Sequence, residues 1–168
     1  KSLSWDQVKR FKDTHDIPLA LKGIATAEDA VRAVELGVEC VYVSNHGGRQ
    51  LDHGRGGIEV LPEVVKEVGG KAEIIVDGGF YRGTDVVKAM ALGADAVALG
   101  RLQGFAMGAA GQAGVARMLE LLETEIEICL GLLGVTSFAD LDESYLYPAQ
   151  PVSEPSVFSA FPLLAEDY

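Results

Sequence analysis

The chain has 168 residues, 48% of them hydrophobic and 23% charged, a composition typical of a globular domain with a substantial core. Its formal net charge of -11 argues against nucleic acids and acidic membrane surfaces as partners, because both attract basic proteins. No apolar run approaches the ~20 residues that a membrane span needs, and the first residues lack the basic-then-apolar pattern of a signal segment. Cys40 and Cys129 lie far apart without metal-ligand spacing, so we expect free thiols, no metal site and a cytoplasmic location.

Short apolar segments alternate with amphipathic ones along the chain. Strands are predicted at residues 19–22, 41–44, 72–76 and 94–99. Helices are predicted at residues 3–15, 28–36, 58–68, 84–92, 105–133 (interrupted around 108–114) and 135–141. Ser4 and Thr26 are the expected N-caps of the first two helices, and Gly23 is expected to end the first strand.

This order of elements predicts an α/β fold with a parallel sheet wrapped by helices. Four strands could form a small open sheet, but they cannot close a TIM barrel, which needs about eight. The chain also opens on a helix that looks like a later helix of a larger array. From Tyr145 onward, Pro148, Pro151, Pro155 and Pro162 exclude a regular helix, so we expect residues 145–168 to form an extended tail outside a domain of residues 1–144.

The stretch from Val41 to Gln50 carries the strongest functional signal. It begins as a buried strand and then breaks into His46, Gly47, Gly48 and Arg49. Chemistry in parallel α/β folds is placed just past the C-terminal ends of strands. His46 could accept a proton near neutral pH, and Arg49 could bind a carboxylate through two hydrogen bonds, as oxidation of a 2-hydroxy acid requires. The plain alternative is a turn capped by His46 beside a solvated Arg49.

Other strand ends repeat this pattern. Lys22 ends the first strand, where its amine could donate to an electron-rich ring or simply reach solvent. Asp77-Gly78-Gly79 follows the third strand and suits either a ligand or an ordinary strand-to-helix turn. Gly100-Arg101 follows the fourth strand, and a glycine turn that opens a helix there favours phosphate binding.

Together these motifs resemble those of the FMN-dependent α-hydroxy-acid oxidases and dehydrogenases, which include glycolate oxidase, lactate oxidase and mandelate dehydrogenase. The residues from Ser44 to Leu51, Ser-Asn-His-Gly-Gly-Arg-Gln-Leu, match the family signature. The stretch from Asp77 to Arg101 is less specific, because it also resembles other FMN- or phosphate-binding barrels, such as inosine monophosphate dehydrogenase and the flavin type of isopentenyl diphosphate isomerase.

The resemblance covers about residues 3–144 and implies the C-terminal half of a TIM barrel, about four βα units, that binds FMN and oxidises a small L-2-hydroxy acid to the 2-oxo acid. It implies His46 as the base that removes the hydroxyl proton or the α-proton, and Arg49 as the carboxylate ligand. The implied FMN contacts are Lys22 and Ser44 near the flavin. Along the ribityl chain and phosphate they are Asp77, Gly78, Gly79, Tyr81, Arg82, Gly100 and Arg101.

One departure concerns the phosphate. The family commonly has two arginines where this chain has Tyr81 and Arg82. Tyr81 carries no charge, so the phosphate would lose a cationic partner, worth about 1.5–3 kcal/mol, unless Arg82 turns toward it. A flavin- or phosphate-binding relative with altered or lost hydroxy-acid chemistry is therefore the alternative interpretation.

The resemblance also implies a partner. The early strands of the barrel, the substrate-binding tyrosines and an aspartate that orients the histidine belong to an N-terminal half that this sequence does not contain. We therefore expect an N-terminal half-barrel polypeptide, cleaved or separately encoded, to complete the fold, and the completed barrel to form a homo-oligomer, by resemblance a tetramer.

Overall fold

A computed structural model describes residues 3–51 and 53–149. The helices are α1 (Trp5–Thr14), α2 (Ala27–Glu35), α3 (Gly57–Val68), α4 (Gly83–Ala91) and α5 (Arg101–Leu133). The strands are β1 (Ala20–Ile24), β2 (Cys40–Val43), β3 (Glu73–Asp77) and β4 (Ala96–Ala98). Single 3-10 turns occur at η1 (His46–Gly48), η2 (Phe138–Asp140) and η3 (Glu143–Tyr145). Among the described residues, no helix is both long and apolar enough to cross a membrane.

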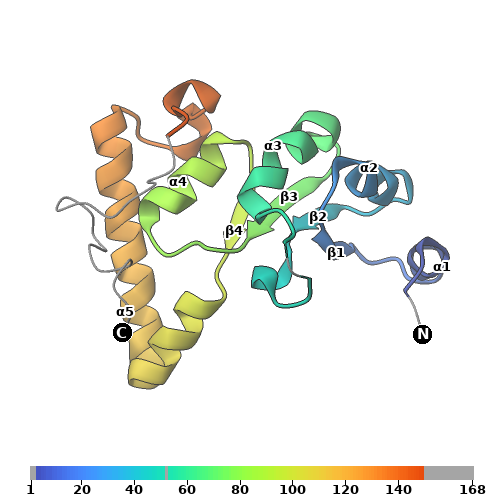
Figure 1. The fold of residues 1–168 in the computed structure, drawn as a ribbon, viewed down its shortest axis with the longest axis horizontal. Helices are drawn as coiled ribbons and strands as arrows, with labels where there is room; N and C mark the ends of the chain where they lie inside the picture. The colour runs from blue at the N-terminus through green and yellow to red at the C-terminus, as the bar shows by residue number, and fades with distance from the viewer. Residues whose placement is uncertain (1–2, 52, 150–168) are drawn as a thin grey trace.

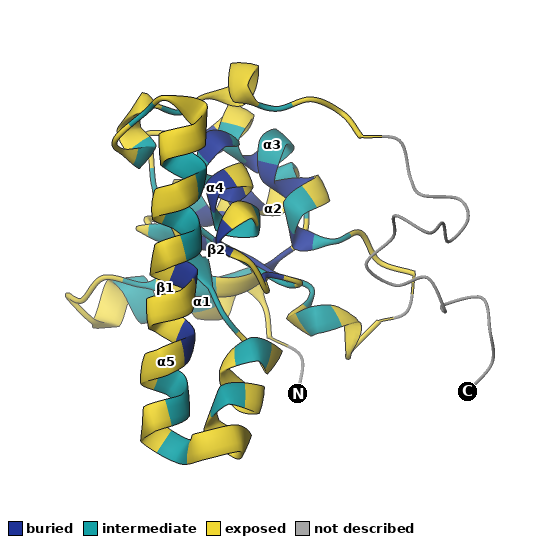
Figure 2. Cartoon of the chain, turned by 90° about the vertical axis from the view of Figure 1, so that its left-hand side faces the viewer, coloured by how far each residue is buried: buried dark blue, intermediate teal, exposed yellow. Residues whose placement is uncertain are grey.

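The strands form one parallel sheet in the order β1-β2-β3-β4, which confirms the predicted parallel α/β fold. Helices α2, α3 and α4 all lie on one face of this sheet (Figure 1). Val41 and Val43 point to that face and are fully buried, whereas Cys40 and Tyr42, which alternate with them, are only half-buried. This period of two places the core between the sheet and its helices, as the dark blue segments of Figure 2 show.

The opposite face of the sheet has a different composition. Residues in register on neighbouring parallel strands share a face, and Lys22, Tyr42, Ile75 and Ala96 are such partners. None of the four is fully buried. This second face therefore carries a polar and aromatic pair beside small and aliphatic residues, with no helix of the described chain packed over it (Figure 1).

The prediction that Gly23 ends the first strand is wrong, because β1 continues to Ile24. The pairing register with β2 shifts between Lys22 and Ile24, which marks a bulge. Gly23 has a φ of 101°, a conformation that glycine adopts without steric cost, so it bends the strand instead of stopping it.

The last long helix also differs from its prediction. It begins at Arg101 instead of residue 105. The predicted interruption around residues 108–114 is confirmed, since Ala110 and Gly111 leave helical geometry. At that break the chain reverses, so α5 is a helical hairpin whose long second arm packs against α4 (Figures 1 and 2). A Cβ on Gly114 would lie 2.1 Å from the carbonyl oxygen of Ala106, so the hairpin closes tightly only because glycine occupies that position.

The short helix predicted at residues 135–141 is wrong as well, since only the 3-10 turn η2 forms there. The Ser137 hydroxyl accepts a hydrogen bond from the Ala139 amide at 3.0 Å, and the Asp140 carboxylate accepts one from the Ser137 amide at 3.2 Å. Such local bonds compete with a continuing helix. In the predicted tail, residues 146–149 have no regular structure, and residues 150–168 lie outside the described residues.

Candidate active site

A cavity of about 280 Å³ lies at the C-terminal ends of β2, β3 and β4. Its walls come from the turn η1, the turn after β3 and the start of α5. The lining includes eight residues predicted to act in binding or catalysis, namely His46, Arg49, Asp77, Gly78, Gly79, Tyr81, Gly100 and Arg101. The structure thus brings together groups that are more than fifty residues apart in the sequence.

His46 is held in an uncommon backbone conformation, with a φ of 56°. Its amide donates to the Ser44 hydroxyl at 3.1 Å, which pins the turn to the end of β2. The Gln50 side-chain amide lies 3.1 Å from His46 Nδ1. The contacting atom of Gln50 is its amide nitrogen, which donates, so Nδ1 of His46 is the acceptor in this contact.

The turn is capped by Asn45 and not by His46, which removes the plain alternative for the histidine. The Asn45 Oδ1 atom accepts from the Gly48 amide at 3.2 Å. The imidazole is therefore not used to close the turn. Asparagine just before a Gly-Gly pair is typical of such turns, so this signal was present in the sequence.

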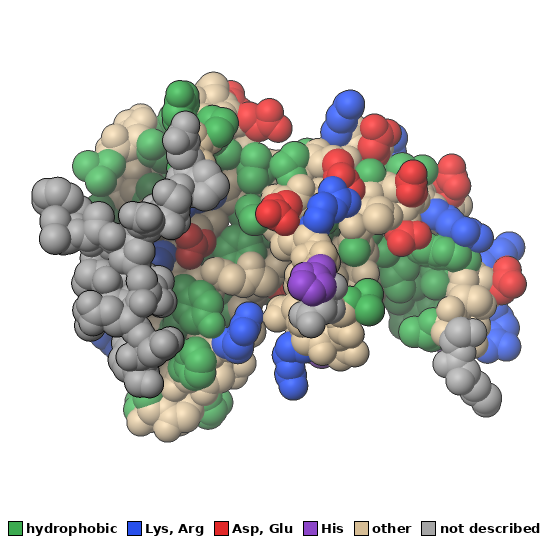
Figure 3. All heavy atoms as spheres, in the orientation of Figure 1, with side chains coloured by type: hydrophobic (Ala, Val, Ile, Leu, Met, Phe, Trp, Pro, Cys, Tyr) green, Lys and Arg blue, Asp and Glu red, His purple; other side chains and the backbone are tan. Residues whose placement is uncertain are grey.

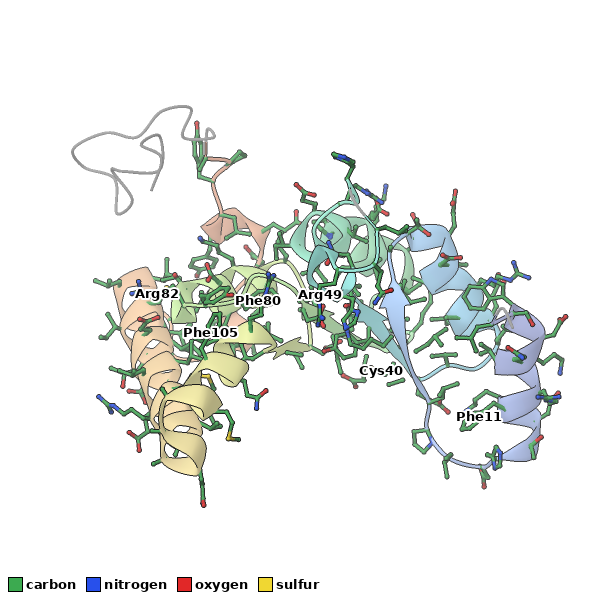
Figure 4. All side chains as sticks on the ribbon, turned by 60° about the horizontal axis from the view of Figure 1, so that its bottom comes forward. Phe11, Cys40, Arg49, Phe80, Arg82 and Phe105 are labelled. Atoms are coloured by element: carbon green, nitrogen blue, oxygen red, sulfur yellow. The ribbon has the colours of Figure 1, made fainter. Side chains whose placement is uncertain are left out.

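Arg49 follows the turn as its C-cap and is exposed. It lines the same cavity as His46, and Figure 4 shows it at the rim of the sheet, on the side where the turns gather. A guanidinium and an imidazole on one cavity wall are the two groups that the sequence pattern suggested for binding and deprotonating a hydroxy acid.

Lys22, Ser44 and Asp77 form a polar cluster that joins β1, β2 and β3. The Lys22 ammonium donates to Ser44 Oγ and to Asp77 Oδ2, each at 2.7 Å, and it lies 4.3 Å from the centre of the Tyr42 ring. Burial, and then the negative charge of Asp77, raise the pKa of Tyr42 to about 12. Lys22 and Ser44 do not line the cavity itself, and they sit behind Asp77.

Asp77 has one unsatisfied oxygen. Its Oδ1 atom is buried and has no hydrogen-bond partner among the described residues, whereas Oδ2 binds Lys22. A buried acceptor without a donor costs about 1–3 kcal/mol. Because Asp77 lines the cavity, a ligand hydroxyl would supply the missing donor.

The glycine turns leave room for an anion beside this carboxylate. Gly78 and Gly79 have φ values of 103° and 83°, and no heavy atom lies within 4 Å of the Cβ position of Gly79 or Gly100. Arg101 opens α5, where unpaired amides and the helix dipole favour negative charge. Its guanidinium nitrogen reaches to 3.3 Å from the Cβ position of Gly47. These residues fit a ligand that carries hydroxyls and a phosphate.

The side chains of Tyr81 and Arg82, in the turn after β3, have different surroundings. Tyr81 is 39% exposed and lines the cavity. Arg82 does not line it, because its guanidinium binds Glu125 on α5, with Nε and Nη2 each 2.9 Å from Oε1 (Figure 4). Glu125 also accepts from the Gly83 amide at 2.7 Å, and these two donors lower the pKa of its carboxyl. The cation predicted from this turn is thus engaged elsewhere.

The surface around the site mixes charges of both signs. In Figure 3, acidic and basic side chains are interspersed over α1, α2 and α3, and no patch of one sign covers that face. Within the part of the chain that the structure describes, no three His, Cys, Asp or Glu residues are grouped to hold a metal ion.

Comparison with known proteins gives one family. Residues 1–148 match the FMN-dependent dehydrogenase family. An L-lactate oxidase from Nostoc sp. (strain PCC 7120 / SAG 25.82 / UTEX 2576) is 47% identical over 148 residues, which are 87% of this chain and 40% of that protein. A peroxisomal (S)-2-hydroxy-acid oxidase from Oryza sativa subsp. japonica is 48% identical over 145 residues, 86% of this chain and 40% of that protein.

Solved structures give the same result. A mandelate oxidase crystallised with (S)-2-phenylpropionate superposes with a TM-score of 0.79 and 49% sequence identity, over 82% of this chain and 41% of the other. A mandelate oxidase with benzoyl-formic acid gives a TM-score of 0.78 at the same identity and coverage. The chain therefore spans about two fifths of the relatives that it matches.

Proposed function

Because the chain belongs to the FMN-dependent dehydrogenase family, we propose that the protein containing it oxidises a small L-2-hydroxy acid to the corresponding 2-oxo acid. The observation that carries this proposal is the shared cavity of His46 and Arg49, set beside an anion-binding turn with an unsatisfied carboxylate oxygen. FMN, when bound, supplies the acceptor for the two electrons that leave the substrate.

Two residues of the chain act on the substrate in this proposal. Arg49 binds the carboxylate, which orients the hydroxy acid and fixes the position of its reacting carbon in the site. His46 removes a proton, either from the hydroxyl as a hydride equivalent leaves the carbon, or from the carbon itself. The Gln50 side chain contacts the imidazole at Nδ1 and so orients the ring.

Other residues hold the cofactor. Asp77 Oδ1 would accept from a ribityl hydroxyl, and Arg101 with the glycine turns would bind the phosphate. The Lys22 ammonium is fixed between Ser44 and Asp77, where its charge would stabilise negative charge on a reduced ring. The residues present therefore fit FMN.

One observation favours the second candidate, a flavin- or phosphate-binding relative without hydroxy-acid chemistry. Tyr81 brings no charge to the cavity, and Arg82 is bound to Glu125, so the turn after β3 provides no cation. Weaker phosphate binding would follow. We rank this candidate second, because the cavity still contains both the imidazole and the guanidinium.

The open face of the sheet supports a further part of the proposal, that this chain is the C-terminal half of a TIM barrel. Among the described strands, β1 and β4 each pair on one side only, and no described helix covers the face of Lys22 and Tyr42. Unpaired edges promote association. We propose that an N-terminal half-barrel segment pairs with these edges. Intact-mass analysis of the purified protein should reveal it, and a soluble monomer of this chain alone would refute the idea.

The test of the activity is anaerobic reduction. The protein loaded with FMN should lose its visible flavin absorbance when lactate, glycolate or mandelate is added. Replacing His46 with Ala should lower that rate by at least ~10²-fold, the scale of general-base catalysis, while flavin stays bound. His15→Ala is the matched control, since His15 lies at the end of α1 and only stacks on Phe11. Absence of bleaching by a broad panel of 2-hydroxy acids would favour the second candidate.

A further inference from the structure

The loop after β2 is anchored at its far end by Arg55. The guanidinium of Arg55 binds the Glu63 carboxylate of α3 with two parallel hydrogen bonds, Nη1 to Oε2 at 2.7 Å and Nη2 to Oε1 at 2.8 Å. Nη2 also donates to the carbonyl oxygen of Ala25 at 3.3 Å. Arg55 thus connects the loop to a helix and to the turn after β1.

Asn45 connects this anchor to the residues of the site. Its Nδ2 atom donates to the backbone carbonyl of Arg55 at 3.0 Å, while its Oδ1 atom accepts from the Gly48 amide at 3.2 Å. One side chain therefore holds both the turn that presents His46 and the residue that ends the loop. The position of the turn depends on where Arg55 is held.

The anchor extends to the neighbouring βα unit. Glu63 Oε1 accepts from the Ala27 amide, the first of α2, at 3.2 Å, in addition to binding Arg55. Its pKa is lowered, chiefly by the hydrogen bond from Arg55. Two of the segments that meet here, Ala25–Ala27 and Arg55, follow the C-terminal ends of β1 and β2, and Glu63 lies within α3.

We infer that Arg55 is a positioning residue, which fixes the loop so that His46 and Arg49 face the cavity together. The inference rests on the proposed function of those two residues. An exposed ion pair contributes little to global stability, and these side chains are 49% and 37% exposed. The pair therefore acts mainly on the local conformation of the loop. A misplacement of a catalytic side chain by about 1 Å can lower activity ~10²-fold.

The test uses the FMN-loaded protein that contains this chain, with Arg55→Met and the milder Arg55→Lys. Hydrogen exchange of the His46 and Gly48 amides is measured first, without substrate. Loss of the hydrogen bonds of the Arg55 guanidinium should speed that exchange about tenfold in Arg55→Met, with no change at the amides of β2 and β3. Arg117→Met removes another exposed pair, Arg117 with Glu120 on α5, and should leave the loop unaffected.

Steady-state kinetics supply the second measurement. Arg55→Met should raise the KM for the hydroxy acid about tenfold through Arg49, while FMN affinity stays within about twofold, because FMN is bound by other turns. The reversed pair, Arg55→Glu with Glu63→Arg, should recover part of the loss. Unchanged loop exchange, or faster exchange across the whole sheet, would overturn the inference. Wild-type protein that no 2-hydroxy acid reduces, with a loop that still responds, would instead overturn the proposed function.

Discussion

Gly57 offers a direct test of how closely α3 approaches the site. It is the first residue of α3 and is buried, and a Cβ added there would lie 2.4 Å from the backbone oxygen of Asp77 and 3.3 Å from Val76 Cγ2. The nearer atom belongs to the backbone of β3, so no side-chain rotation relieves the contact. In Gly57→Ala either the helix or the strand end must move.

The cost follows from this contact. Overpacking in a close-packed interior costs about 1–3 kcal/mol, and the gain of alanine over glycine in a helix offsets up to about 1 kcal/mol of it. Gly57→Ala should therefore lower the free energy of unfolding by about 1–2 kcal/mol, or the melting temperature by roughly 2–8 °C for a domain of this size.

Urea unfolding followed by circular dichroism measures the change, with Gly104→Ala as the control. Gly104 lies in the first arm of α5, and its Cβ position has no heavy atom within 4 Å, so alanine should stabilise the protein by about 0.5–1 kcal/mol. The two variants should thus change the urea midpoint in opposite directions. Equal stability of the two would refute the reasoning that the helix is held against Asp77 by the absence of a side chain.

Three further outcomes are expected. The phenol of Tyr42 should ionise near pH 12, above its ordinary value of 10, so the stability that its neutral form contributes is lost as the pH rises through that window; spectroscopic titration should lose this transition in Tyr42→Phe. The carboxyl of Glu125 has a lowered pKa because of Arg82, so its contribution exists above the ordinary value of 4.5 and disappears as the pH falls below it; the stability gap between wild type and Glu125→Gln should close in acid. Arg101→Met should weaken FMN at least about tenfold and leave riboflavin, which lacks the phosphate, unaffected in a fluorescence titration.

The regular part of the fold was predictable because its causes are local. The alternation of Val41 and Val43 with partly exposed neighbours marks a strand with one helix-covered face, and glycines follow four of the helices within two residues of their ends. The errors occurred where another interaction overrides the local pattern. Gly23 bends β1 within its ladder instead of ending it, and the bonds of Ser137 and Asp140 replace a helix by one turn.

The candidate site also has features that the sequence predicts and features that depend on tertiary contacts. Placing His46, Arg49 and Asp77 at strand ends follows from the order of the elements alone, since parallel strands end at one rim. The bond of Arg82 to Glu125 and that of Arg55 to Glu63 join residues that only the tertiary structure makes neighbours. A sequence pattern gives the charge of such a guanidinium but not the direction in which its side chain points. The sequence therefore predicts Arg82 as an FMN contact and predicts no role for Arg55.

The reversal of α5 at Ala110 and Gly111 gives the helix two arms with different contacts. One arm places Arg101 in the cavity wall, and the other packs against α4. The sequence of residues 102–109 can therefore change, or be replaced by a segment of another length, while the second arm stays packed against α4. Such modularity gives evolution, and the protein engineer, a region for remodelling what the cavity accepts without rebuilding the scaffold.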